Sequence, residues 1–298
     1  MRRKIYDPLI PYADPLFGRS NRFLQQMTGH PPGVVGCSGQ SCIAPVEDKS
    51  RDAVWIRGGE EDGEQAPDAV RYHRGSIAAL IVSPFRHDFA HDLELPVEGF
   101  LAGVRKLCDR DGIVFILDDV RCGFRLHLGG SGELFGVRPD LSCYCKAIAN
   151  GYPLAACLGR DSLKRAAQEV YFTGSYFTSA VPMAASLATL KELEAAGGVA
   201  RMRTTGEMLR DGMLSQARSH NLEVTWSGPP AMPFMSFKAD AGRFKRSRVF
   251  CGEASRRGVY FAPMHNWFLS AAHSERDISR TLEVTDAAFK AVRDQFGG

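Results

Sequence analysis

Apolar positions along the chain follow two different periods. Continuous apolar runs at residues 77–82 and 113–117 are typical of strands buried on both faces of a parallel sheet. Between them, apolar residues recur every three or four positions over residues 97–109, which predicts a helix with one buried face. An Asp-Gly turn leads into the second strand. This order of strand, helix and strand predicts a β-α-β unit.

The alternation of strand and helix patterns continues beyond this unit. We predict strands at 141–144, 155–158 and 170–172, and helices at 162–169 and 181–195. Such alternation is typical of an α/β fold with a mostly parallel or mixed sheet that helices cover on both faces.

The pattern changes after Gly197-Gly198 and is weak before residue 76. The C-terminal part predicts an amphipathic helix at 200–220, a small sheet and a last helix at 277–296; the strands of that sheet are expected at 222–226, 234–238 and 259–261. Near the N-terminus only a short helix around 22–27 is indicated. We therefore expect a poorly patterned segment at 1–75, a large-domain core at 76–197 and a small α+β domain at 198–298.

Composition narrows the class of protein. The chain has 298 residues, of which 44% are apolar and 24% charged, as in ordinary globular proteins. Its net charge of +3 is too small to indicate binding to nucleic acid or to an anionic membrane. No secretory signal or transmembrane segment is apparent, so we expect a cytoplasmic protein.

The eight cysteines have irregular spacings that do not resemble a disulfide framework. Cys37 with Cys42, or Cys143 with Cys145, would supply half of a metal site, but no matching Cys/His pair follows either. We therefore expect no metal.

Two residues carry the candidate chemistry. Asp118 follows the apolar run at 113–117, so it is expected at the carboxyl end of a strand, where open α/β sheets bind ligands. Lys146 stands in a stretch without other charges, and we expect apolar surroundings to favour its neutral amine. Pyridoxal phosphate requires such a pair, because a lysine amine forms a Schiff base with it and an acid keeps its pyridine nitrogen protonated. Taken alone, Asp118 is also explained as a residue that caps a helix. Lys146, taken alone, is also explained as an ordinary surface lysine.

The segment 78–193, with Asp118-Asp119-Val120 and Lys146, resembles the class III (subgroup II) aminotransferases, the group of the glutamate-1-semialdehyde aminomutases and omega-transaminases. The resemblance implies a fold type I pyridoxal-phosphate transferase, with Lys146 as the Schiff-base lysine and Asp118 on the pyridine nitrogen. It also implies that Val120 packs against one face of the cofactor ring and that Asp119 is structural.

The resemblance also implies a homodimer with shared active sites. The run 174–180 matches the region where family members donate a hydroxyl to the cofactor phosphate of the neighbouring subunit. Ser175 is the first candidate for that role and Thr178 the second, while an ordinary turn before a helix explains the same residues. Residues 258–273 resemble the aminomutase-like branch, with His265, Asn266 and Trp267 as candidates for the substrate entrance and His273 as a packing residue.

The chain departs from the family in two respects. Cys145 stands before the lysine, where the family usually has Gly, Ser or Ala. The family's Ser/Gly-Thr-Glu-Ala phosphate-binding turn and its second ring-stacking aromatic residue are not found before residue 77. We therefore expect an N-terminally truncated member.

We predict a pyridoxal-phosphate-dependent aminotransferase or aminomutase, acting on a small amine or amino acid and a carbonyl acceptor. The alternative is a degenerate or truncated homologue with little or no activity. A nucleotide-binding α/β protein is disfavoured, because neither G-x-G-x-x-G after a strand nor G-x-x-x-x-G-K-[ST] occurs. The motifs do not distinguish a mutase, a transaminase, a racemase or a decarboxylase, or identify the substrate.

Overall fold

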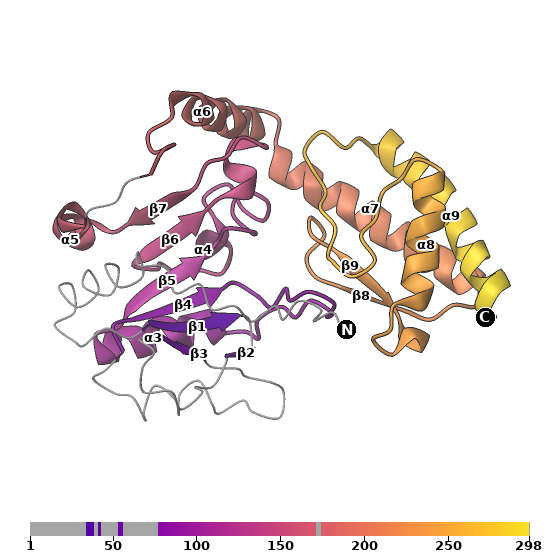
Figure 1. The fold of residues 1–298 in the computed structure, drawn as a ribbon, viewed down its shortest axis with the longest axis horizontal. Helices are drawn as coiled ribbons and strands as arrows, with labels where there is room; N and C mark the ends of the chain where they lie inside the picture. The colour runs from indigo at the N-terminus through magenta and orange to yellow at the C-terminus, as the bar shows by residue number, and fades with distance from the viewer. Residues whose placement is uncertain (1–33, 39–40, 43–52, 56–76, 171–173, 298) are drawn as a thin grey trace, which may run out of the picture.

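The computed structural model describes residues 34–38, 41–42, 53–55, 77–170 and 174–297. A twisted sheet and its helices form one part of the molecule, and three long helices with a two-stranded sheet form the other (Figure 1). The predicted α/β fold with a mostly parallel sheet is confirmed. The short helix expected around 22–27 and most of the strand expected at 170–172 lie outside the described residues.

The main sheet has the strand order β2-β1-β4-β5-β6-β7, with β3 beside β1. Strands β1, β4, β5 and β6 are parallel, whereas β7 runs antiparallel to β6. Its strands are β1 (Val34–Ser38), β2 (Ser41–Cys42), β3 (Ala53–Trp55), β4 (Ala79–Ser83), β5 (Val114–Asp118), β6 (Leu141–Tyr144) and β7 (Ala156–Gly159).

The predicted β-α-β unit is confirmed as β4, α3 (Phe100–Asp111) and β5. Helix α3 buries Leu101, Val104 and Cys108 against the apolar side chains of the two strands. It ends at Gly112, whose φ of +67° is easily adopted only without a side chain, and whose N–H donates to the Cys108 carbonyl. This tight ending directs the chain straight into β5.

The pattern of the first 75 residues did not indicate the strands β1 to β3. Strand β1 pairs with β4 over its whole length, from Val34 opposite Ala79 to Ser38 opposite Ser83. These strands are two to five residues long, so periodicity within each is too short to recognise.

Shorter elements follow β5. They are α4 (Ser131–Leu134), the 3-10 helix η1 (Lys146–Ala149), η2 (Asp161–Leu163) and α5 (Lys164–Glu169). Asp140, which precedes β6, is buried and accepts a hydrogen bond of 2.7 Å from the Phe115 N–H. It also forms ion pairs with Arg105 of α3 at 2.9 Å and with Arg160 at 2.7 Å, so one carboxylate joins α3, β5 and the end of β7.

Helix α6 (Ala180–Ala195) leads to α7 (Gly198–Ser219) and the second part of the chain. That part contains the antiparallel pair β8 (Val224–Ser227) and β9 (Phe234–Phe237), then η3 (Lys238–Asp240), α8 (Lys245–Arg256) and α9 (Glu275–Phe296). The predicted last helix is confirmed and begins with a capping box, in which Ser274 and Asp277 exchange hydrogen bonds.

The strand predicted at 259–261 is wrong. The Val259 N–H donates to the Ala254 carbonyl at the end of α8, and Phe261 is buried with its ring centroid 4.3 Å from that of Trp267. This run is apolar because it covers the end of the helical core, not because it pairs with another strand. Within the described residues no helix is long and apolar enough to cross a membrane.

Candidate functional site

The sequence-predicted pair lies at the carboxyl edge of the main sheet. Asp118 is the last residue of β5, and Lys146 opens η1 two residues after β6 ends. Because β5 and β6 are parallel neighbours, both residues leave the sheet at the same edge. Strand β4 ends at this edge too, and His87 follows it.

The two consecutive acids have different surroundings. Asp119 is fully buried, and its Oδ2 accepts a hydrogen bond of 2.7 Å from the Ser131 N–H at the start of α4. Burial raises its pKa. Asp118 is half-buried; its Oδ1 accepts from the Val120 N–H at 3.2 Å, and its Oδ2 has no hydrogen-bond donor among the described residues. Asp119 thus holds the loop together, while Asp118 keeps an oxygen available for a ligand.

Lys146 stands in an uncommon backbone conformation. Its φ is +46°, in the left-handed region that non-glycine residues rarely occupy. Such conformations cluster at functional sites, where the surrounding structure imposes them. The amine makes no hydrogen bond or ion pair with the described residues. The expectation of apolar surroundings is wrong for this chain, because Lys146 is exposed. Its neighbours in sequence are apolar, but the turn into η1 directs the lysine away from them.

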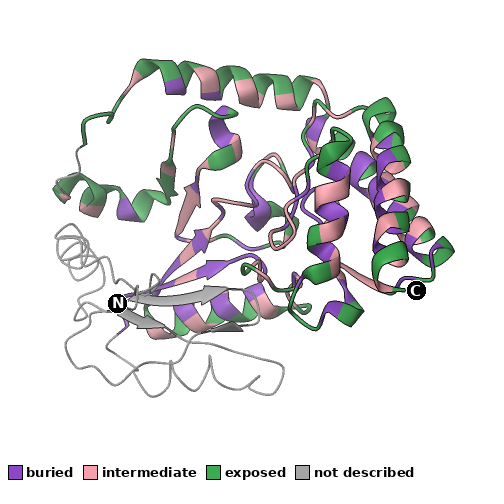
Figure 2. Cartoon of the chain, turned by 45° about the vertical axis from the view of Figure 1, so that its right-hand side comes forward, coloured by how far each residue is buried: buried purple, intermediate pink, exposed green. Residues whose placement is uncertain are grey.

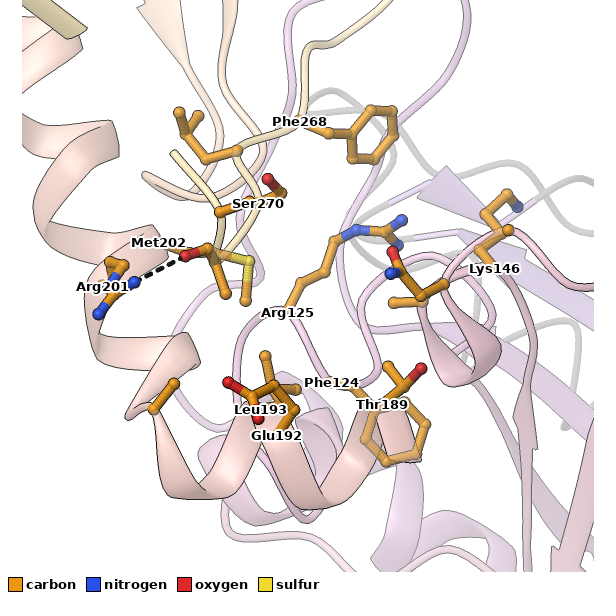
Figure 3. Close-up of a pocket in the computed structure, with 17 residues that line it drawn as sticks. Phe124, Arg125, Lys146, Thr189, Glu192, Leu193, Arg201, Met202, Phe268 and Ser270 are labelled. Atoms are coloured by element: carbon orange, nitrogen blue, oxygen red, sulfur yellow. Dashed lines mark hydrogen bonds between the residues drawn. The ribbon is translucent and has the colours of Figure 1, made fainter. Parts of the chain in front are cut away.

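A pocket of about 520 Å³ extends from Lys146 toward the second part of the chain. Arg125 and Lys146 line it from the loops after β5 and β6, Thr189 and Glu192 from α6, and Phe268 from the segment before α9 (Figure 3). Asp118 and Val120 do not line this pocket. The lining therefore combines segments that are far apart in sequence.

Two arginines that the sequence analysis missed stand next to this edge. Arg121 donates from Nη1 to the His87 carbonyl at 2.8 Å and to the Asn266 Oδ1 at 3.2 Å. Arg125 donates to the Arg121 carbonyl at 2.5 Å, and its guanidinium lies over the Phe268 ring. No carboxylate of the described residues forms an ion pair with either guanidinium. Burial lowers the pKa of both, and Arg121 adds to the lowering at Arg125. Two arginines within the seven residues that follow Asp118 at the end of β5 were the available signal in the sequence.

Within one chain, Ser175 and Thr178 do not contribute to the pocket that Lys146 lines. Both are exposed on the turn before α6, and neither lines the pocket. The Thr178 hydroxyl donates to the Phe177 carbonyl at 2.6 Å.

The C-terminal candidates separate into contact and packing residues. Asn266 is buried and reaches Arg121, whereas the Trp267 indole donates to the Ala262 carbonyl at 2.9 Å. The His265 ring bonds to the Asn266 carbonyl at 2.7 Å. His273 is a hydrogen-bonded packing residue, as expected, because its Nδ1 accepts from the Ser270 N–H at 3.0 Å.

An acid and a lysine at the ends of adjacent parallel strands form the kind of pair that pyridoxal-phosphate chemistry requires. The family model "Aminotransferase class-III" matches residues 41–275. The chain therefore belongs to the class III aminotransferase family, as the sequence resemblance predicted, and the enzymes of this family use pyridoxal phosphate.

Two curated relatives illustrate the range of activities. The aminopentol aminotransferase of Sphingopyxis macrogoltabida is 41% identical over 235 residues, which cover 79% of this chain and 56% of that protein. The glutamate-1-semialdehyde 2,1-aminomutase of Syntrophobacter fumaroxidans is 38% identical over 234 residues, which cover 73% of this chain and 53% of that protein. The chain thus spans about half the length of these relatives.

Solved structures agree with this assignment. The FumI protein of Sphingopyxis sp. MTA144, in its pyridoxal-phosphate internal aldimine form, superimposes with a TM-score of 0.84 at 34% identity over 95% of this chain and 70% of that chain. An omega-transaminase from Sphaerobacter thermophilus superimposes with a TM-score of 0.76 at 20% identity over 93% of this chain and 72% of that chain, which establishes the shared fold.

Proposed function

We propose that the protein transfers an amino group between a small amine or amino acid and a carbonyl acceptor, using pyridoxal phosphate held at the edge formed by β5 and β6. The observation that carries this proposal is the placement of Asp118 and Lys146 at the ends of adjacent parallel strands. The chain's own atoms fit the cofactor, since the Lys146 amine has no partner among the described residues and Oδ2 of Asp118 has no donor there.

Each residue has a separate role in this proposal. Lys146 would be the covalent attachment point, Asp118 would hold the pyridine nitrogen and Val120 would pack against one face of the ring. When bound, pyridoxal phosphate supplies an electron sink for the negative charge that develops at the substrate carbon. Asp118 maintains that capacity, because its carboxylate keeps a proton on the facing nitrogen.

Lys146 also moves the proton. As a free amine, Nζ would take a proton from the substrate carbon and would return one to it. An exposed lysine on a constrained turn suits this exchange, because the backbone is fixed while the side chain can swing. The proposed domains, 76–197 and 198–298, would border the substrate pocket between them.

The proposed active form is a homodimer. Helix α6 is largely exposed although it is rich in apolar residues (Figure 2). Leu187 is 74% exposed, and Tyr176 on the preceding turn is 89% exposed. Exposed apolar surface of this kind is typical of a protein interface. A second copy is the occupant we propose, because a two-fold pair would bring the Ser175 and Thr178 hydroxyls toward the phosphate end of the partner's site.

The proposal predicts covalent attachment at one lysine. The purified chain is mixed with pyridoxal phosphate, its absorbance spectrum is recorded, and the adduct is reduced with borohydride for peptide mass spectrometry. We expect a visible-edge band and a cofactor mass on the peptide that contains Lys146, and neither in Lys146→Ala. Lys106→Ala is the matched control, since Lys106 is an exposed lysine of α3. Equal labelling of Lys146→Ala and the wild type would refute the assignment.

A further inference from the structure

Two thiols face each other across the edge of the main sheet, close to the candidate site. Cys143 in β6 lies directly opposite Cys157 in the antiparallel strand β7. Opposite residues of an antiparallel pair point to the same face of the sheet, with Cα atoms about 4.5 or about 5.5 Å apart. Both separations lie within the range of about 4.4–6.8 Å that a disulfide requires. The two thiols are free, and their side chains form a hydrogen bond with each other.

The pair is chemically asymmetric. Cys157 is exposed, and the hydrogen bond from Cys143 lowers its pKa to about 7, which favours the reactive thiolate. Cys143 is half-buried, and its hydrogen bond to Cys157, its burial and the nearby Asp118 charge all raise its pKa. Cys157 is thus suited to attack an oxidant first. Cys143 is suited to react afterwards with the oxidised Cys157.

The other described cysteines lack these properties. Cys108, Cys122 and Cys251 are buried, and burial raises the pKa of each thiol. Thiolates, not thiols, react with oxidants, so these three are inert by comparison. Cys145 is half-buried and lies outside the β6–β7 pairing.

We propose that Cys143 and Cys157 form a redox-active thiol pair that a peroxide oxidises to a disulfide. The Cys157 thiolate attacks one peroxide oxygen, so that an S–O bond forms, the O–O bond breaks and the departing oxygen leaves as water after protonation. The sulfur of Cys143 then attacks the resulting sulfenic acid. The S–S bond forms, the S–O bond breaks and a second water leaves with the Cys143 proton. Two thiols thereby reduce one hydrogen peroxide to two waters.

The location links the pair to the candidate site. Cys143 is also in register with Asp118 on its other side, and Lys146 follows it by three residues. A disulfide would fix the edge strand β7 to the strand that carries this part of the site. The thiol chemistry itself does not depend on the proposed transferase function.

The test uses the reduced full chain with hydrogen peroxide as the probe at pH 7, and peptide mass spectrometry as the readout. We expect one cross-link, between Cys143 and Cys157, that dithiothreitol reverses. Cys145→Ser should still form it. Cys143→Ala should instead accumulate a sulfenic acid at Cys157 that dimedone traps. A chain that forms no such cross-link, or that joins Cys143 to Cys145, would overturn the proposal.

A second measurement separates chemistry from misfolding. The alkylation rate of Cys157 is followed against pH in the wild type and in Cys143→Ala, with circular dichroism to verify that both fold alike. We expect a midpoint near 7 in the wild type and a higher midpoint, toward the ordinary value of about 8.5, in Cys143→Ala. Identical midpoints in the two folded chains would show that the thiols do not interact and would overturn the assignment of roles.

Discussion

The guanidinium of Arg125 lies over the ring of Phe268, with its central carbon 4.7 Å from the ring centroid. Arg125 belongs to the loop after β5 and Phe268 to the segment before α9, so this contact joins the two parts of the chain beside the Lys146 pocket. A cation partly removed from water without an acidic partner is costly, and an anion entering the pocket would offset that cost.

We therefore predict that Arg125 holds an anionic group of the ligand. Arg125→Met should keep the packing on Phe268 but weaken the binding of a short dicarboxylate about 10- to 100-fold, as expected for the loss of one charge-assisted hydrogen bond. Isothermal titration of both chains measures this. The matching diamide is the control ligand and should bind both chains equally. Equal dicarboxylate affinity in the two chains would exclude an anion site at Arg125.

Asp118→Asn should retain some cofactor and lose about 100-fold or more in turnover, because a neutral amide cannot stabilise a protonated pyridine nitrogen while the shape of the pocket survives. Amino transfer from any donor used by the wild type measures this loss. Asp119→Asn is a useful comparison, since Asp119 bonds the Ser131 N–H and is expected to affect folding more than chemistry. Near-wild-type turnover in Asp118→Asn would show that this acid is not the nitrogen partner.

Leu187→Glu should shift the chain from dimer to monomer, because it places a charge in the middle of the exposed apolar face of α6. Light scattering coupled to size-exclusion chromatography gives the mass. Ser279→Glu adds the same charge to an exposed position of α9 and should leave the mass unchanged. A wild-type chain that is monomeric at every concentration would rule out the homodimer.

A shared site makes a separate prediction. Chains carrying Lys146→Ala and chains carrying Ser175→Ala should each be impaired, and mixing them should restore one site with both residues intact. Activity after mixing, compared with each parent alone, is the measurement. If mixing restores nothing although mixed dimers form, Ser175 does not act on the partner's site.

Asp140→Ala should lower the free energy of unfolding by about 3–5 kcal/mol, because it breaks the buried ion pair of Asp140 with Arg105 and leaves the buried Phe115 N–H without its acceptor. Asp109→Ala removes a carboxylate that is 61% exposed and pairs with the same arginine at 2.7 Å, so its cost should be under about 1 kcal/mol. Urea denaturation of both variants measures the difference. If both variants lost a similar free energy of unfolding, the burial of Asp140 would contribute little to stability.

The strongest apolar patterns determined the core of the fold without tertiary information. The runs that became β4 and β5 contain enough consecutive apolar residues to be buried on both faces, and α3 repeats its apolar positions at the helical period. The placement of Asp118 at the end of β5 follows from the same run. These features are local, so the sequence alone predicts them.

Helix α8 shows where local pattern is insufficient. Its buried positions are Ser247, Phe250, Cys251 and Ala254, which follow helical spacing but include a serine and an alanine among many charged residues. Only contact with α9 and the phenylalanine cluster makes this face a core face. The run at 259–261 is the opposite case, because it has the apolar character of a strand but no partner strand to pair with.

The sequence by itself determined the family and the strands that carry Asp118 and Lys146, and it predicted the chemistry of this pair. The tertiary structure decided the exposure of Lys146, the Arg125–Phe268 contact across the pocket and the pairing of Cys143 with Cys157. The physical reason is distance along the chain. A strand or helix is selected by neighbours a few residues away, whereas a pocket or a facing thiol pair depends on which distant segments the packed core brings together.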